Sequence, residues 1–372
     1  MPQWPTQQPA PQWPTQQPVP QWPAPQPGMR VGHPAPTYPV HVVPGYYQPP
    51  RPKGGAGLRA LLFAIIGVIV ILGFLITLSS YLSDDYEDPW PSPSPAPTEP
   101  TPEPPQPDPT TVPEPDLSPP DLPEPTTYTE ATEWMESNLV YAESTRVPTE
   151  CVVKPVGAKA SADQLEEHLN ELTACLWLVW DPPLTRAGFE LPRPPVTVYS
   201  SSITTRCGKI DDVNAVYCGG DQRIYYSIDV LESLPSSVRS APFVADAVVA
   251  HEFGHAIQAR TGILISETLH EQRSTTTKSK ALDLSRRLEQ QADCFSGMFT
   301  NAVASANGLD ANELKTLQTL FYNFGDDVLS GDPGYVGNHG SGAARKRWFT
   351  AGETTDQLQT CNAFVAKASE VK

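Results

Sequence analysis

Basic residues are scarce in this 372-residue chain, which holds 25 lysines and arginines against 42 aspartates and glutamates, for a net charge of −17. Nucleic-acid binding needs a basic surface, so this deficit argues against a nucleic-acid partner. Proline is scarce in one part only: 34 of the 44 prolines lie in residues 1–126, which leaves 10 for residues 127–372. Because proline lacks the backbone donor of helices and sheets, the first part is not a globular domain, whereas the second is long enough to form one core.

Cysteine is absent from the first 150 residues. The chain has an even number of cysteines, all in the C-terminal part, which fits disulfides in an oxidising compartment. Six cysteines allow fifteen pairings, so counting alone does not give the connectivity. We expect Cys207 to pair with Cys218, because these two cysteines are the closest in sequence. We further expect Cys294 to pair with Cys361, which would tie the C-terminus to the rest of the domain, and Cys151 and Cys175 are then the pair that remains.

Charge is also absent from residues 60–78, which read ALLFAIIGVIVILGFLITL. Nineteen such residues are long enough to cross a membrane as a helix. Lys53 and Arg59 precede this stretch and acidic residues follow it, so the positive-inside rule places the N-terminus in the cytoplasm and the C-terminal part outside the cell membrane. The alternative is a cleaved signal peptide, which the long preceding segment and the lack of a small-residue cleavage site disfavour.

The two proline-rich segments flank this stretch. Residues 2–28 contain a nine-residue repeat, PQWPTQQPA, PQWPTQQPV and PQWPAPQPG. The repeat predicts a disordered cytoplasmic tail, either a docking tail for a cytoplasmic partner or only a solvated one. Residues 83–126 carry eleven acids and no base, which predicts an extended linker that proline stiffness and charge repulsion hold open.

Residues 127–372 have the patterns of an α+β domain with more helix than strand. Ser161 and Gln164 form a capping box ahead of an apolar run to Trp180, and the prolines at 182 and 183 are expected to end that helix. Alternating β-branched and aromatic residues predict two strands. The expected strands are 196–201 and 223–228, and the other expected helices are 128–143, 242–260, 279–305 and 311–322.

Residues 249–258, VAHEFGHAIQ, carry the clearest chemical signal. His251 and His255 are four residues apart, so on a helix both imidazoles project from one face at a spacing that suits tetrahedral Zn²⁺. Glu252, beside the first histidine, can act as general base toward a water molecule at that metal. The alternative is a surface helix with incidental histidines, which the apolar residues around the motif disfavour.

A second helical segment, RRLEQQADCFSG at 286–297, offers further ligands. Glu289 and Asp293 share one helical face. We expect Glu289 to be the third zinc ligand and Asp293 to accept the free N–H of a liganding imidazole. The alternative is a solvated face on which these carboxylates form salt bridges with Arg286 and Arg287.

The blocks VAHEFGHAIQ, LEQQADCFSG and NHGSGAARKRWFTAGE, with the earlier TRCG and YCGGDQRIYYSID, resemble the bacterial neutral zinc metallopeptidases. The resemblance covers roughly residues 195–364. It implies a mainly helical, zincin-like domain of the glutamate type, with one catalytic zinc ion at His251, His255 and Glu289 and with Glu252 catalytic. One departure is Gly342, where a polar residue is more usual in that family.

His339 lies in a glycine-rich segment, GDPGYVGNHGSG. In zincins a downstream histidine or tyrosine often donates a hydrogen bond to the developing oxyanion, a role open to His339 or Tyr335. The alternative is that His339 only caps the helix expected near Ala343.

The sequence therefore predicts a membrane-anchored zinc metallopeptidase that hydrolyses peptides or proteins outside the cytoplasmic membrane. Two other functions stay open: a catalytically inactive module in which zinc is structural, and an adaptor that acts through its tail. A structural site needs a fourth protein ligand, and Cys294, adjacent to Asp293, does not supply it, because on a helix its side chain points about 100° away from that of Asp293. The expected parts are a tail (1–57), a transmembrane helix (58–82), a linker (83–126) and the metallopeptidase domain (127–372).

Overall fold

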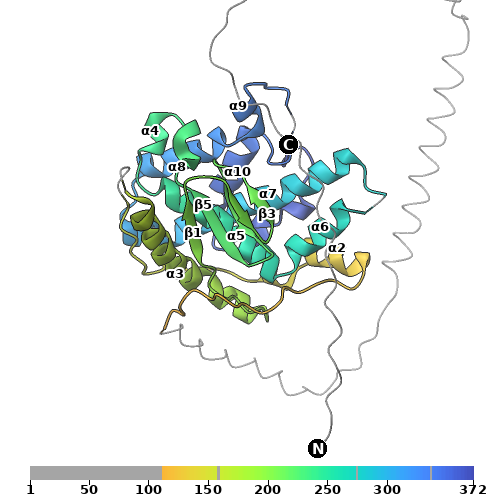
Figure 1. The fold of residues 1–372 in the computed structure, drawn as a ribbon. Coiled ribbons are helices and arrows are strands. Elements are labelled where there is room, and N and C mark those ends of the chain that lie inside the picture. Colours follow the sequence, from red (N-terminus) through yellow and green to blue (C-terminus); the bar gives the residue numbers. More distant parts are fainter. Residues whose placement is uncertain (1–110, 157–159, 274, 336) are drawn as a thin grey trace, which may run out of the picture. The chain divides into compact units, whose positions relative to one another are not determined.

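The computed structural model describes residues 111–156, 160–273, 275–335 and 337–372. They belong to one compact unit, Thr98–Lys372, drawn in colour in Figure 1. The repeat tail, the expected membrane helix and residues 83–110 of the expected linker lie outside the described residues. Within the described ranges, no helix combines the length and the apolar character that a membrane crossing needs.

Helices dominate the domain and strands contribute a smaller part, in agreement with the α+β prediction. The α-helices are α2 (Tyr128–Glu136), α3 (Ala162–Arg186), α4 (Ser236–Arg239), α5 (Val244–Arg260), α6 (Ile263–Glu271), α7 (Lys278–Asn307), α8 (Ala311–Asn323), α9 (Asp326–Ser330) and α10 (Gly342–Gly352). Short 3₁₀ helices are η1 (Leu139–Ala142), η2 (Val230–Ser233), η3 (Leu358–Cys361) and η4 (Ala363–Val365).

The strands form two small sheets. The strands are β1 (Val196–Tyr199), β2 (Ile203–Thr205), β3 (Gly208–Ile210), β4 (Ala215–Cys218) and β5 (Arg223–Ser227). In the first sheet the order is β1-β5-β4, with β1 parallel to β5 and β4 antiparallel to it; β2 and β3 pair as an antiparallel hairpin. Helix α3 packs along β1, and α5 packs against β4 and β5 near the centre of the domain (Figure 1).

Helix α3 differs from its prediction at the C-terminal end. The expected capping box of Ser161 and Gln164 is present. The helix does not end at Trp180 but continues through Pro182 and Pro183 to Arg186. Pro183 and Leu184 are buried in the core, and this burial offsets the backbone hydrogen bonds that the two prolines cannot donate.

The N-terminal boundary of the folded domain also differs. We assigned residues 111–126 to the open linker, but this stretch lies against the domain. The buried guanidinium groups of Arg193 and Arg260 donate hydrogen bonds to the carbonyl oxygens of Pro113 (2.7 Å) and Pro120 (3.0 Å). Buried charged donors need acceptors, and a proline-rich segment with free carbonyls supplies them.

Helix α5 is buried on all sides, and only Ala245 and His255 among its residues are part-exposed. Its polar residues therefore need partners inside the protein.

The three disulfides join Cys151 to Cys175, Cys207 to Cys218 and Cys294 to Cys361, which are the pairs named from the sequence.

Candidate metal centre

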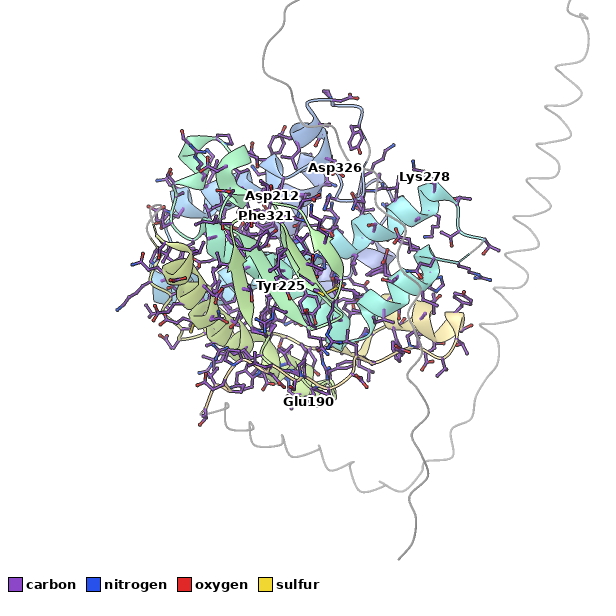
Figure 2. All side chains as sticks on the ribbon, in the orientation of Figure 1. Glu190, Asp212, Tyr225, Lys278, Phe321 and Asp326 are labelled. Atoms are coloured by element: carbon purple, nitrogen blue, oxygen red, sulfur yellow. A yellow bond between two sulfur atoms is a disulfide. The ribbon has the colours of Figure 1, made fainter. Side chains whose placement is uncertain are left out.

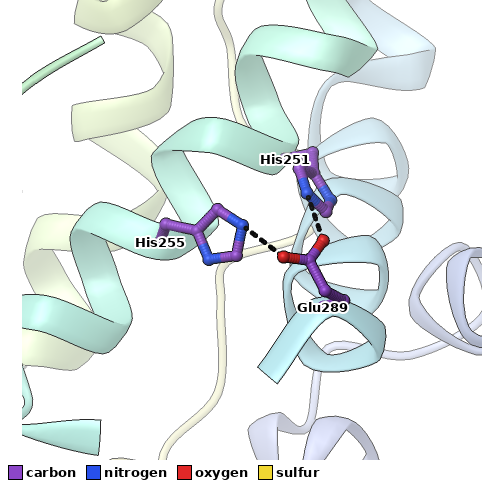
Figure 3. Close-up of side chains that lie close together, drawn as sticks. All are labelled: His251, His255 and Glu289. Atoms are coloured by element: carbon purple, nitrogen blue, oxygen red, sulfur yellow. Dashed lines mark ion pairs between the residues drawn. The ribbon is translucent and has the colours of Figure 1, made fainter. Parts of the chain in front are cut away.

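The two histidines of α5 and a glutamate of α7 meet where these helices pack together (Figure 3). His251 Nε2 lies 3.3 Å from Glu289 Oε2, and His255 Nε2 lies 3.6 Å from Glu289 Oε1. One donor atom from each residue lies within 4.8 Å of the others. This is the cluster of metal-ligating type found among the described residues, and its two imidazole nitrogens and one carboxylate oxygen are a donor set that suits Zn²⁺.

The cluster is largely shielded from solvent. The side chains of His251, His255 and Glu289 are 8%, 12% and 15% exposed, so the last two keep a small contact with solvent. Burial raises the pKa of Glu289, but electrostatic interactions with the neighbouring His255 and His339 outweigh it and hold that pKa well below its usual range. Glu289 is therefore a carboxylate at neutral pH, the form in which it can bind a metal.

Asp293 lies one turn beyond Glu289 and contacts the other nitrogen of His251. His251 Nδ1 is 2.9 Å from Asp293 Oδ1, within ion-pair distance although the approach does not meet hydrogen-bond geometry. Burial lowers the pKa of His251, but the Asp293 and Glu289 carboxylates outweigh it and raise that pKa to about 10. This is the placement expected for a residue that orients the imidazole rather than binding the metal.

Arg345 of α10 completes this part of the site. Its Nε and Nη2 atoms donate to the two oxygens of Asp293 at 2.9 and 2.7 Å, and both side chains are buried. The fork geometry fixes the carboxylate plane and neutralises its charge. Local spacing in the sequence does not predict this role of Arg345, because its partner Asp293 lies 52 positions earlier in the chain.

Glu252 is held by the sheet. Its Oε2 accepts a hydrogen bond of 2.7 Å from the backbone N–H of Tyr217 on β4, and the side chain is buried. A carboxylate fixed through one oxygen keeps the other for proton transfer. Strand β4 was not predicted from the sequence, so the partner of Glu252 was not predicted either.

Asp326 on α9 orients His339; Asp326 is labelled in Figure 2. Asp326 accepts from the backbone N–H groups of His339 and Gly340 at 2.9 Å each, and its other oxygen lies 3.2 Å from His339 Nδ1. Burial lowers the pKa of His339, but the charges of Glu289 and Asp326 raise it overall. The charge of Glu289 contributes to this rise in the pKa of His339, whereas Tyr335 lies on the exposed part of the same loop.

Two buried residues of α7 donate hydrogen bonds to the backbone of the loop that contains His339. Arg286 donates to the carbonyl oxygen of Gly337 at 3.0 Å, and Gln290 donates to that of His339 at 2.9 Å. The unusual Gly342 also has a steric reason, because a Cβ there would collide with the carbonyl oxygen of Tyr322. A polar side chain at position 342 does not fit this packing.

Gln258 is a further buried neighbour of the cluster. It lies one helical turn after His255, and its Oε1 is 2.7 Å from His255 Nδ1. The spacing of three residues on a helix is the signal that would have found it in the sequence. Cys294, next to Asp293 in the sequence, is bonded to Cys361 and offers no thiolate as a fourth ligand.

Comparison with known proteins agrees with this geometry. The model of the family described as "Putative neutral zinc metallopeptidase" matches residues 136–364. The protein named "Uncharacterized protein Rv2575" of Mycobacterium tuberculosis is 29% identical over 206 residues, which are 50% of this chain and 67% of that protein. "Uncharacterized protein YpfJ" of Escherichia coli is 26% identical over 209 residues, 54% of this chain and 72% of that protein. No solved structure matches the chain.

Proposed function

This chain belongs to the putative neutral zinc metallopeptidase family, and from that premise we propose that it hydrolyses peptide bonds at one zinc ion held by His251, His255 and Glu289. The observation that carries the proposal is the convergence of these three donors within 4.8 Å. The contacts of the unliganded nitrogens add support, since Asp293 and Gln258 lie where they can orient the two imidazoles.

Zinc, when bound there, supplies Lewis-acid chemistry that polarises a carbonyl group and makes water a stronger nucleophile at neutral pH. Glu252 takes a proton from the attacking water and passes it to the nitrogen of the leaving amine, so that the C–O bond forms and the C–N bond breaks. Its hydrogen bond from Tyr217 N fixes the carboxylate for both transfers. His339, oriented by Asp326, donates a hydrogen bond to the carbonyl oxygen as that atom gains negative charge.

A purely structural zinc site is the first rival function. Such a site is closed by four protein ligands, whereas a catalytic site keeps one position open. The cluster has three members among the described residues, and the disulfide removes Cys294 as a fourth. Both observations favour catalysis.

An adaptor that acts through its tail is the second rival. The PQW repeats and any partner of theirs lie outside the described residues. A chain that lacks residues 1–50 separates the two functions: retained peptidase activity with a lost cellular phenotype would support the adaptor, and an unchanged phenotype would support the enzyme.

We place the domain outside the cytoplasmic membrane, anchored by residues 60–78 with the N-terminus in the cytoplasm, and we assign it a zincin-like fold of the glutamate type. The charge asymmetry around residues 60–78 and the three disulfides support this location. Protease added to intact cells should remove the part of the chain after Asp84. Protection of that part together with digestion of the PQW repeats would contradict the topology.

The ligand assignment is tested by the zinc content of the purified full-length chain. His251→Ala, His255→Ala and Glu289→Ala should each lose the metal, because two remaining protein ligands hold Zn²⁺ poorly. Asp293→Ala should retain zinc with an affinity weakened by about 10–100-fold. If Asp293→Ala abolishes zinc binding while Glu289→Ala leaves it intact, Asp293 is the ligand and the proposed site is wrong.

A further inference from the structure

His255 has two ring nitrogens with different surroundings. Nε2 faces Glu289, and Nδ1 lies 2.7 Å from the side-chain oxygen of Gln258. A neutral imidazole carries its proton on one nitrogen only, so the tautomer depends on whether Gln258 presents an acceptor or a donor to Nδ1.

The orientation of the Gln258 amide is fixed by a backbone group. Gln258 Nε2 lies 2.8 Å from the carbonyl oxygen of Leu288, which can only accept a hydrogen bond. The amide nitrogen must therefore point to Leu288, and the amide oxygen must point to His255. An oxygen next to Nδ1 requires the proton on Nδ1, which leaves the lone pair of Nε2 toward Glu289.

The second N–H of the Gln258 amide begins a series of hydrogen bonds that continues through the core. It donates to Gln291 Oε1 at 3.1 Å. Gln291 Nε2 in turn donates to the carbonyl oxygen of Cys361 at 3.1 Å and to the hydroxyl of Tyr141 at 2.8 Å. The series of hydrogen bonds ends at the Tyr141 hydroxyl, which donates to the carbonyl oxygen of Met135 at 2.9 Å.

Every N–H and O–H group in this series of hydrogen bonds has an acceptor. Backbone carbonyl groups, which can only accept, fix the orientation of each side chain in the series. Gln258 and Gln291 are 0% exposed and Tyr141 is 5% exposed, so water does not compete for these bonds. Turning one amide around would place two acceptors or two donors against each other at several points. The low dielectric of the core makes such a mismatch costly.

We propose that Gln258, locked by Gln291 and Tyr141, is a positioning residue that holds His255 as the Nδ1–H tautomer before any metal binds. The proposal rests on the proposed function, because it assigns the network a role at the zinc site. The two histidines are then held differently, His251 by the charged Asp293–Arg345 pair and His255 by neutral amides. The amides orient His255 without adding negative charge to the site.

Nitrogen NMR of the metal-free, full-length chain labelled at histidine tests the proposal. The protonated and unprotonated ring nitrogens have distinct shifts, so the neutral form of His255 reports its tautomer directly. We expect Nδ1–H in the unsubstituted protein and its loss in Gln258→Met, which has similar volume and no acceptor oxygen. The same variant should bind Zn²⁺ about 10–100-fold more weakly.

Two further variants separate positioning from folding. Gln258→Glu keeps an acceptor oxygen toward Nδ1 but loses both donors, so it should lower stability and still keep the Nδ1–H tautomer. Gln222→Met removes another buried glutamine that donates to a backbone carbonyl, that of Pro120, and should leave His255 unchanged. If Gln258→Met does not fold, the tautomer of His255 in Gln258→Glu is the measurement that decides.

An Nε2–H tautomer in the unsubstituted protein would overturn the proposal, as would an unchanged tautomer in Gln258→Met or a lost one in Gln258→Glu. These readings do not depend on a bound metal. Failure of the proposed function would instead appear as a chain that binds no zinc although His255 holds the expected tautomer.

Discussion

Gly254 of α5 and Ala292 of α7 lie so close that a Cβ built on Gly254 would be 3.1 Å from the Cα of Ala292. Gly254 stands between His251 and His255, and Ala292 stands between Glu289 and Asp293. A close approach of the two helices therefore falls in the middle of the candidate ligand set. Two small residues at the crossing allow the imidazoles and the carboxylate to meet.

Gly254→Val should separate the two helices and weaken zinc binding. The added branched side chain has no space at this crossing, and overpacking of a core typically costs about 1–3 kcal/mol of stability. Ala245→Val adds the same β-branching in the same helix at a part-exposed position and serves as control. Zinc affinity and urea unfolding of both variants check this. Equal zinc affinity in the two would contradict a role for the crossing.

The pair of Asp293 and Arg345 should be costly to break from one side. Arg345→Met leaves the buried Asp293 carboxylate without its bidentate partner, and such a loss typically destabilises a protein by about 3–5 kcal/mol. The unfolding free energy from urea titration measures this.

The double variant Arg345→Met with Asp293→Leu provides the matched comparison. It removes both charges together, so it should be less destabilised than the sum of the two single variants. Additive effects of the two substitutions would show that the ion pair is not a unit.

His168 and Asp246 form a second buried pair, which links α3 to α5 at 2.6 Å. Burial lowers the pKa of His168, but the hydrogen bond and charge of Asp246, with Glu171, raise it overall. A raised folded-state pKa means that the stabilisation is fully present below the unfolded pKa of about 6.5 and is lost as pH rises through the folded value.

His168→Gln should therefore cost most stability below about pH 6.5 and progressively less at higher pH. Urea unfolding across a pH series measures the difference from the unsubstituted protein. His270→Gln is the control, because His270 contacts a hydroxyl and a carbonyl group, Thr132 Oγ1 and Tyr128 O, rather than a carboxylate. A difference for His168→Gln that does not change with pH would contradict the assignment.

The ligand cluster was predictable because helical spacing places His251 and His255 on one face and Glu289 and Asp293 on another. That the second helix supplies the third ligand was inferred from its carboxylates and then supported by the resemblance, but the same spacing also allowed a solvated charged face. Asp326 and Arg345 could not be found by local spacing, since each acts on a residue in another element.

The fold was predictable where the local signals agreed with the tertiary contacts. The capping box at Ser161 and the helices around residues 244–260 and 278–307 are examples. The continuation of α3 through Pro182 and the docking of residues 111–126 were not predicted. Burial of the helix end in the first case, and long-range hydrogen bonds in the second, outweigh the local preference of proline.

The central claim is that Glu252 acts in catalysis without binding the metal, and the most direct test is Glu252→Gln in the full-length chain, with zinc content and peptide hydrolysis measured on the same sample. The amide can keep the hydrogen bond from Tyr217 N but cannot accept the proton of water. We predict zinc near one equivalent and hydrolysis reduced by at least the factor of about 10²–10⁴ typical of a general base. Full zinc content with undiminished hydrolysis would contradict the account.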